Sequence, residues 1–139
     1  MPAKNLYHDA VVNSLKSDGW TITHDPLTLV VGDRNLHIDL GAEQMPIGAE
    51  KAGRKIAVEV QSFCSPSPIA DLQQALGQYV MYRAFLAREQ PDRVLFLAVP
   101  VGTYDGILTE LVGSVMLTEL AVWLLVFDPS SQEVVRWTN

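Results

Sequence analysis

The hydrophobic positions near the N-terminus repeat at helical spacing. The apolar positions that carry this pattern are Leu6, Ala10, Val11 and Leu15. A repeat of three to four residues predicts a helix over residues 4–17. Asp18-Gly19 follows it and provides a C-terminal stop signal. The chain is therefore expected to begin with one amphipathic helix.

After this helix the pattern changes to short apolar runs separated by turn residues. The predicted strands are 20–23, 27–31, 36–40, 47–51 and 56–61. Turn signals at 32–35 and 52–55 indicate two hairpins. If the second hairpin has a two-residue loop at Gly53-Arg54, Glu50 lies opposite Ala57. Glu50 would then share a face of the sheet with Glu59 and Gln61.

The second half of the chain alternates helices and strands. Ser67 and Pro68 are a typical N-cap and first helical residue, and they begin a helix predicted over residues 68–88. A nearly continuous apolar run at 93–99 indicates a strand buried on both faces. A short helix at 104–117 and strands at 121–127 and 133–137 complete the prediction. This order predicts one α/β domain over residues 1–139, with helices packed on a mixed sheet.

The strand at 56–61 carries the strongest chemical signal. Glu59 interrupts an apolar stretch, and a buried carboxylate is costly unless it is paired, hydrogen-bonded or bound to a metal. Asp39 lies in the preceding predicted hairpin and is a second acid among apolar neighbours. Asp39, Glu50 and Glu59 therefore form a candidate site for Mg²⁺ or Mn²⁺, which prefer oxygen ligands. Metal-assisted hydrolysis of a phosphodiester is the chemistry that such a site favours.

Each of these residues also has an ordinary structural interpretation. Glu59 and Gln61 could lie on a solvated strand face, and Asp39 could brace the adjacent turn. Glu50 could pair with Lys51 or Lys55 on a surface hairpin. A further polar group on the predicted long helix could simply face solvent. Its members are Gln74, Gln78 and Tyr82.

Composition limits how the chain could bind nucleic acid. The net charge is −6 and the isoelectric point is near 4.9, which argues against coating DNA by charge alone. A DNA enzyme of this composition needs a local basic patch, a bridging divalent metal or a partner that supplies affinity. Cys64 is the only cysteine, and no run reaches the roughly 20 apolar residues of a membrane span. With no signal-peptide pattern either, we expect a cytoplasmic protein without membrane contact.

Five separated segments of the chain form a recognisable series. They are HDAVVNSLKSDGWTITHDPLTL, IDLGAE, GRKIAVEVQSF, DLQQALGQYVMYR and VFDP. Together and in this order they resemble the XisH family of fdxN-element excision controlling factors. The resemblance implies a restriction-endonuclease-like core in the order αβββαβ, with extra C-terminal elements and a PD-(D/E)xK nuclease motif. The glutamate of that motif corresponds to Glu59, and Gln61 replaces its lysine. Its first acid corresponds to Asp39 or to Glu50.

The resemblance also suggests supporting residues. Gln78 and Tyr82 have the QxxxY spacing of a helical motif in RecB-like nucleases, and Gln74 lies one turn earlier. His8 lies in the helix where related nucleases often carry an additional acidic residue. The three residues of the long helix are expected to line the site above the carboxylates, and His8 is a further supporting residue.

The function implied by this resemblance is control of a programmed DNA rearrangement. One form of it is a Mg²⁺-dependent DNA endonuclease or DNA-processing protein. The alternative is an inactive, nuclease-like accessory protein that binds DNA or assembles a recombination complex, which the net acidity and Gln61 favour. The implied partners are DNA, a site-specific recombinase and the companion factor XisI. By analogy with the fold, a homodimer is compatible with the chain.

Overall fold

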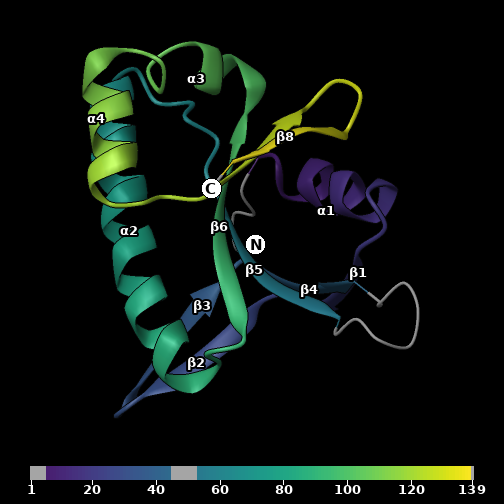
Figure 1. The fold of residues 1–139 in the computed structure, drawn as a ribbon. Helices are drawn as coiled ribbons and strands as arrows, with labels where there is room; N and C mark the ends of the chain where they lie inside the picture. The colour runs from purple at the N-terminus through teal and green to yellow at the C-terminus, as the bar shows by residue number, and fades with distance from the viewer. Residues whose placement is uncertain (1–5, 45–52, 139) are drawn as a thin grey trace.

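A six-stranded mixed sheet organises the computed structural model, which describes residues 6–44 and 53–138 (Figure 1). Its strand order is β1-β4-β5-β6-β7-β8, and a separate two-stranded ribbon pairs β2 with β3. The helices are α1 (His8–Ser17), α2 (Pro68–Glu89), α3 (Val101–Asp105) and α4 (Leu111–Glu119). The strands are β1 (Thr21–His24), β2 (Leu27–Val31), β3 (Arg34–Ile38), β4 (Leu40–Gln44), β5 (Arg54–Val60), β6 (Arg93–Pro100), β7 (Leu124–Asp128) and β8 (Glu133–Thr138).

Three parallel strands form the centre of the sheet. β5 pairs with β6 and β6 pairs with β7, both in parallel, whereas the outer pairs are antiparallel. A parallel connection needs a crossover, and α2 provides it between β5 and β6. Residues 95–100 of β6 are all buried, as the apolar run in the sequence predicted. The carboxyl ends of β5, β6 and β7 therefore meet at one edge of the sheet.

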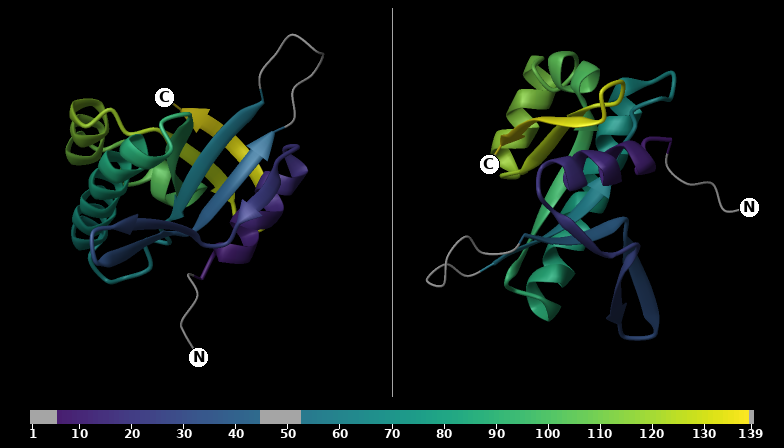
Figure 2. Two further views of the ribbon diagram at one scale, coloured as in Figure 1. Left: turned by 90° about the horizontal axis from the view of Figure 1, so that it is seen from below. Right: turned by 90° about the vertical axis from the view of Figure 1, so that its right-hand side faces the viewer.

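Each face of the sheet packs against a different helix. Alternate residues of β5 point to opposite faces, so Ala57 packs toward α2 whereas Val58 and Val60 pack toward α1. The left view of Figure 2 shows α1 and α2 on either side of the sheet. Under α1 the core contains an aromatic group in which Phe96 contacts both Trp123 and Trp137, at ring-centroid distances of 5.7 and 4.9 Å. Trp20 is 3% exposed and also packs on Trp137.

Helix α2 is fixed at its start and at its middle. The Ser67 side chain accepts a hydrogen bond from the Ala70 amide at 3.2 Å, and Pro68 occupies the first turn. Halfway along, the buried Tyr79 hydroxyl donates to the Leu95 carbonyl and accepts from the Trp123 amide. A buried phenol whose donor and acceptor are both used ties the helix to β6 and to the start of β7. The orientation of α2 over the sheet is set in this way.

The structure corrects the predicted strand pairing. β4 was not predicted, and its partner is β5, so Gly41 is the residue opposite Ala57. β6 occupies the other side of β5 and places Leu95 beside Ala57, so the pairing predicted for 56–61 was wrong. The other strand of that predicted hairpin, 47–51, lies outside the described residues. β4 contains Gly41 and Ala42, which have low strand propensity, and it is a strand because β1 and β5 pair with it on both sides.

Two further boundaries differ from the prediction. Asp39 lies at a bend between β3 and β4, whereas the sequence placed it inside a strand. The single helix predicted at 104–117 is two helices, α3 and α4. Within residues 6–44 and 53–138, no helix is both long and apolar enough to cross a membrane.

The C-terminal end of α4 contains a backbone conformation that alanine rarely adopts. Ala121 has a φ of +50°, the Ala121 amide donates to the Thr118 carbonyl, and the Val122 amide donates to the Leu117 carbonyl. This is the hydrogen-bond pattern of a Schellman motif, whose left-handed residue is usually glycine. The methyl group of an L-residue makes this conformation unfavourable by about 1 kcal/mol or more.

Replacing Ala121 with glycine should therefore stabilise the protein. We expect Ala121→Gly to raise the free energy of unfolding by roughly 1 kcal/mol, because it removes the left-handed strain. Urea denaturation followed by circular dichroism measures the change. Ala84, an exposed residue inside α2, provides the matched control, since Ala84→Gly should lower stability by about 1 kcal/mol. A loss of stability in both variants would contradict the strain at Ala121.

Candidate functional site

Two carboxyl groups meet at the carboxyl end of β5. Leu40 is opposite Val58 in the β4–β5 ladder, so the register brings the next pair, Asp39 and Glu59, side by side. The Asp39 Oδ2 atom accepts a hydrogen bond from the Val60 amide at 2.8 Å. This bond fixes the bend that follows β3 and directs the Asp39 carboxylate toward β5. Asp39 and Glu59 are therefore distant in the sequence but adjacent in the folded sheet.

The Glu59 carboxyl group is buried in surroundings that disfavour its ionised form. Its side chain is 6% exposed, and its Oε2 atom has no hydrogen-bond partner among the described residues. The pKa of Glu59 is raised from 4.5 to about 10, mainly by burial and in addition by a side-chain hydrogen bond with the adjacent Asp39 and by charge repulsion from it. Without a cation, Glu59 therefore holds its proton at neutral pH. Asp39 and Glu59 thus form a closely spaced pair of carboxyl groups, in which Glu59 is the protonated member.

Helix α2 contributes polar side chains above this pair. The Gln61 Nε2 atom donates to the Gln78 Oε1 atom, which joins β5 to α2. Burial raises the pKa of Tyr82, and so do the negative charges of Glu59 and Asp39. That electrostatic interaction places the Tyr82 phenol near both acids, with its proton retained. The site thus contains Asp39, Glu59, Gln61, Gln78 and Tyr82.

The other predicted site residues have different surroundings. Gln74 is exposed on α2. His8 is 6% exposed, and its Nε2 atom lies 2.9 Å from Asp25 Oδ1 and 3.0 Å from Asp25 Oδ2. Among the described interactions, none joins His8 to Asp39 or Glu59. Glu50 lies outside the described residues.

Asp25 is the polar partner that sequence reasoning missed. It follows β1, which is antiparallel to β4, so Asp25 lies at the same sheet edge as Asp39. The Asp25-Pro26 pair looked like a simple turn signal, and no pattern in the sequence linked it to His8. Only the packing of α1 beside β1 shows the pairing.

The oxygen donors of this site suit a hard divalent cation. Asp39 and Glu59 supply carboxylate oxygens, and Gln61 and Gln78 supply amide oxygens, which are ligand types used by Mg²⁺. The buried and unpartnered Oε2 atom of Glu59 is the observation that fits a cation best. Within residues 6–44 and 53–138, no group of three His, Cys, Asp or Glu side chains gathers as a metal site. A cation there would have two carboxylates from the described chain and would complete its shell with water or phosphate.

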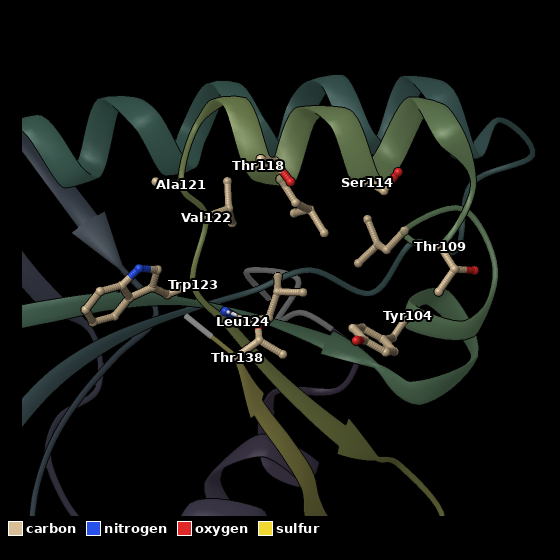
Figure 3. A pocket seen from close by; sticks show the side chains of 11 residues that line it. Tyr104, Thr109, Ser114, Thr118, Ala121, Val122, Trp123, Leu124 and Thr138 are labelled. Carbon is tan, nitrogen blue, oxygen red and sulfur yellow. Dashed lines mark hydrogen bonds between the residues drawn. The ribbon is translucent and has the colours of Figure 1, made fainter.

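A separate pocket of about 620 Å³ lies between α4, the start of β7 and the end of β8 (Figure 3). None of the described residues that line it carries a charge. The hydroxyl groups of Thr109 and Ser114 donate to backbone carbonyls of their own segments. Its described lining includes no carboxylate, histidine or cysteine that could bind a metal. We therefore place the candidate site at the carboxyl pair.

The raised pKa of Glu59 makes stability depend on pH. The folded state keeps a proton that the unfolded state releases above pH 4.5, so stability should fall as pH rises toward about 10. The limiting slope for one such group is about 1.4 kcal/mol per pH unit. Glu59→Gln keeps the shape without the titration, so urea denaturation at about pH 6 and about pH 8 should show a clearly smaller pH dependence.

Glu89→Gln is the control for that measurement. Glu89 is an exposed carboxylate at the end of α2, so this variant should keep the pH dependence of the wild-type protein. An equal slope in the wild type and Glu59→Gln would show that Glu59 does not hold a proton in the folded state.

Comparison with known proteins identifies the family of the chain. The chain matches the XisH protein family model over residues 1–135. An XisH family protein from Nostoc punctiforme PCC 73102 has a crystal structure with a TM-score of 0.88 and 40% identity, covering 97% of this chain and 100% of that chain. An fdxN element excision controlling factor protein from Anabaena variabilis has a TM-score of 0.86 and 40% identity, covering 98% of this chain and 100% of that chain. None of the curated proteins compared with the chain matches it. The chain belongs to the XisH family.

Proposed function

We propose that this XisH family chain is a metal-dependent DNA-processing protein that acts in the excision of a DNA element. The excision role comes from the name of the Anabaena variabilis relative. The chemical role depends on one observation, the buried and unpartnered carboxyl oxygen of Glu59 beside Asp39. A protein fold maintains such a group at a cost, and a functional cation would offset that cost.

We also propose that the fold is a restriction-endonuclease-like core with a PD-(D/E)xK-type site. In support, α1 is followed by antiparallel strands, and then by β5, the crossover helix α2 and the parallel strand β6. Asp39 and Glu59 occupy the two acidic positions of such a site, on a bend and on the central strand. Between the two alternatives for the first acid, the register favours Asp39.

Each described residue has a distinct task in this proposal. Asp39 and Glu59 would hold the cation. When bound, Mg²⁺ or Mn²⁺ would neutralise phosphate charge and lower the pKa of a water molecule. The Gln61 amide, held by Gln78, would orient a water or a phosphate oxygen by hydrogen bonding. The protonated Tyr82 phenol would donate to a phosphate oxygen from the α2 side.

A second candidate function is a nuclease-like accessory protein that binds DNA or assembles a recombination complex without cleaving DNA. Gln61 is the observation that favours it. An uncharged amide cannot transfer a proton or supply positive charge, and the Gln61 amide is already bonded to Gln78. In this alternative the carboxyl pair would serve structure or metal binding alone.

Metal binding can be tested without substrate. Mg²⁺ or Mn²⁺ should raise the thermal midpoint of the wild-type protein, since a ligand at 100 times its Kd stabilises by about 2.7 kcal/mol. Asp39→Asn and Glu59→Gln should lose this response, because each removes one of the two carboxylate ligands. Asp33→Asn, an exposed change at the turn between β2 and β3, should keep it. The same metal response in all four proteins would rule out the carboxyl pair as the binding site.

Cleavage distinguishes the two functions. Linear, branched and single-stranded DNA should be incubated with the protein in Mg²⁺ or Mn²⁺, comparing the wild type with Glu59→Ala and Gln61→Lys. A nuclease should lose at least about 100-fold in rate with Glu59→Ala, since a catalytic metal supplies several kcal/mol. Cleavage gained only in Gln61→Lys would support the accessory function. Wild-type cleavage that survives Glu59→Ala would place the active site elsewhere.

A further inference from the structure

The carboxyl edge of the sheet is strongly acidic. The ends of β1, β5, β6 and β7 and the starts of β4 and β8 lie at this edge, because of the strand directions. Asp71 joins them from the first turn of α2, which follows β5. The acidic residues at this edge are Asp25, Asp39, Glu59, Asp71, Asp105, Asp128 and Glu133. The candidate site therefore lies within a region of negative charge.

Three of the described cations lie at the opposite edge. Arg54 and Lys55 begin β5, and Arg93 begins β6. Lys55 lies 3.4 Å from Asp92, and Arg93 lies 3.5 Å from Glu43, so both have nearby acids of their own. Four residues of extended strand separate Lys55 from Glu59, which is roughly 13 Å. These side chains are placed to stabilise the far end of the sheet.

Two other arginines are bound elsewhere. The Arg83 Nη1 atom donates to the Leu120 and Ala121 carbonyls at 2.6 and 3.1 Å. Arg136 donates to the Tyr104 hydroxyl from β8, which is three strands away from β5, or roughly 14 Å at the usual strand spacing. Among the ion pairs of the described residues, none involves Asp39 or Glu59. The described chain thus supplies no cation to its own carboxyl pair.

This distribution opposes the approach of bare DNA. A phosphodiester would meet six acidic residues at this edge besides the protonated Glu59, and like charges repel over a Debye length of about 8 Å at physiological salt. A divalent ion at Asp39 and Glu59 would offset only the two nearest acids. Independently of the charge count, the buried Oε2 atom of Glu59 has no hydrogen-bond partner among the described residues, so an oxygen acceptor at the centre of the edge is open to an added cation. DNA binding there requires cations from outside the described chain.

We propose that this acidic edge is the docking surface for a basic protein segment, whose Lys and Arg side chains supply the missing charge. The proposal rests on the proposed DNA-processing function and names a partner chemistry for the same site. Asp39 and Gln61 are partly exposed, so a basic side chain can reach the site beside them without entering the space around Glu59. The partner would bring its cations to the point where the phosphate must bind.

The test measures binding of a fluorescent octalysine peptide by anisotropy, with no activity required. One variant combines Asp71→Asn, Asp105→Asn and Asp128→Asn, which lowers the negative charge of the edge and leaves Asp39 and Glu59 intact. Its control combines Asp33→Asn, Glu89→Gln and Glu119→Gln, three exposed acids away from that edge. Both variants change the net charge by the same amount. Circular dichroism spectra and thermal midpoints verify that both are folded.

We expect the edge variant to bind the peptide at least about fivefold more weakly than the wild type, and the control to stay within about twofold. Equal weakening in both variants would overturn the proposal, because binding would then follow net charge alone. Absence of peptide binding by the wild type would overturn it as well. Failure of the metal response at Glu59 would remove the DNA-processing function separately, since peptide binding is measured without metal or DNA.

Discussion

The contact between Asp39 and the buried Glu59 carboxyl is the constraint on which the site depends. β5 pairs with β4 on one side and with β6 on the other, so Glu59 cannot turn toward solvent without breaking a central strand. The fold therefore holds two acids together and must compensate their repulsion with a proton or a cation. In the chain alone, a proton on Glu59 removes the repulsion between the two acids. A cation that binds there would replace this proton.

Helix α2 couples this constraint to the core. Tyr79 fixes the helix to Leu95 and Trp123, and Gln78 and Tyr82 lie on either side of it along the same helix. The rotation that buries Tyr79 places Gln78 against Gln61 and Tyr82 near the acids. Core packing and site geometry are thus set by one helix orientation. A change that shifts α2 would disturb both together, whereas the pocket beneath α4 could change independently of the acids.

The local sequence pattern predicted some helices and strands correctly. It failed for a strand whose pairing partners are distant in the sequence. Ser67-Pro68 and the apolar run of β6 predicted α2 and β6 closely, because caps and burial leave a signal in adjacent residues. β4 left no such signal, since Gly41 and Ala42 become strand only between two partners. The same limit affected the site. Glu59 stood out as an acid among apolar residues, but its neighbour could be identified as Asp39 only from the register, and spacing alone had favoured Glu50.

The charge at the acidic edge of the sheet affects metal binding and phosphate binding in this XisH family chain in opposite ways. A site built for phosphate must attract an anion, yet the acids that would hold a metal here lie among further carboxylates. Metal binding and DNA attraction therefore make opposite demands on this edge of the sheet. A nuclease that worked alone would satisfy both with its own lysines and arginines. In this chain four of the described cations are bound at other positions. Under the proposed function the two demands would therefore be separated: the fold would supply the carboxylates, and an associated molecule would supply the positive charge.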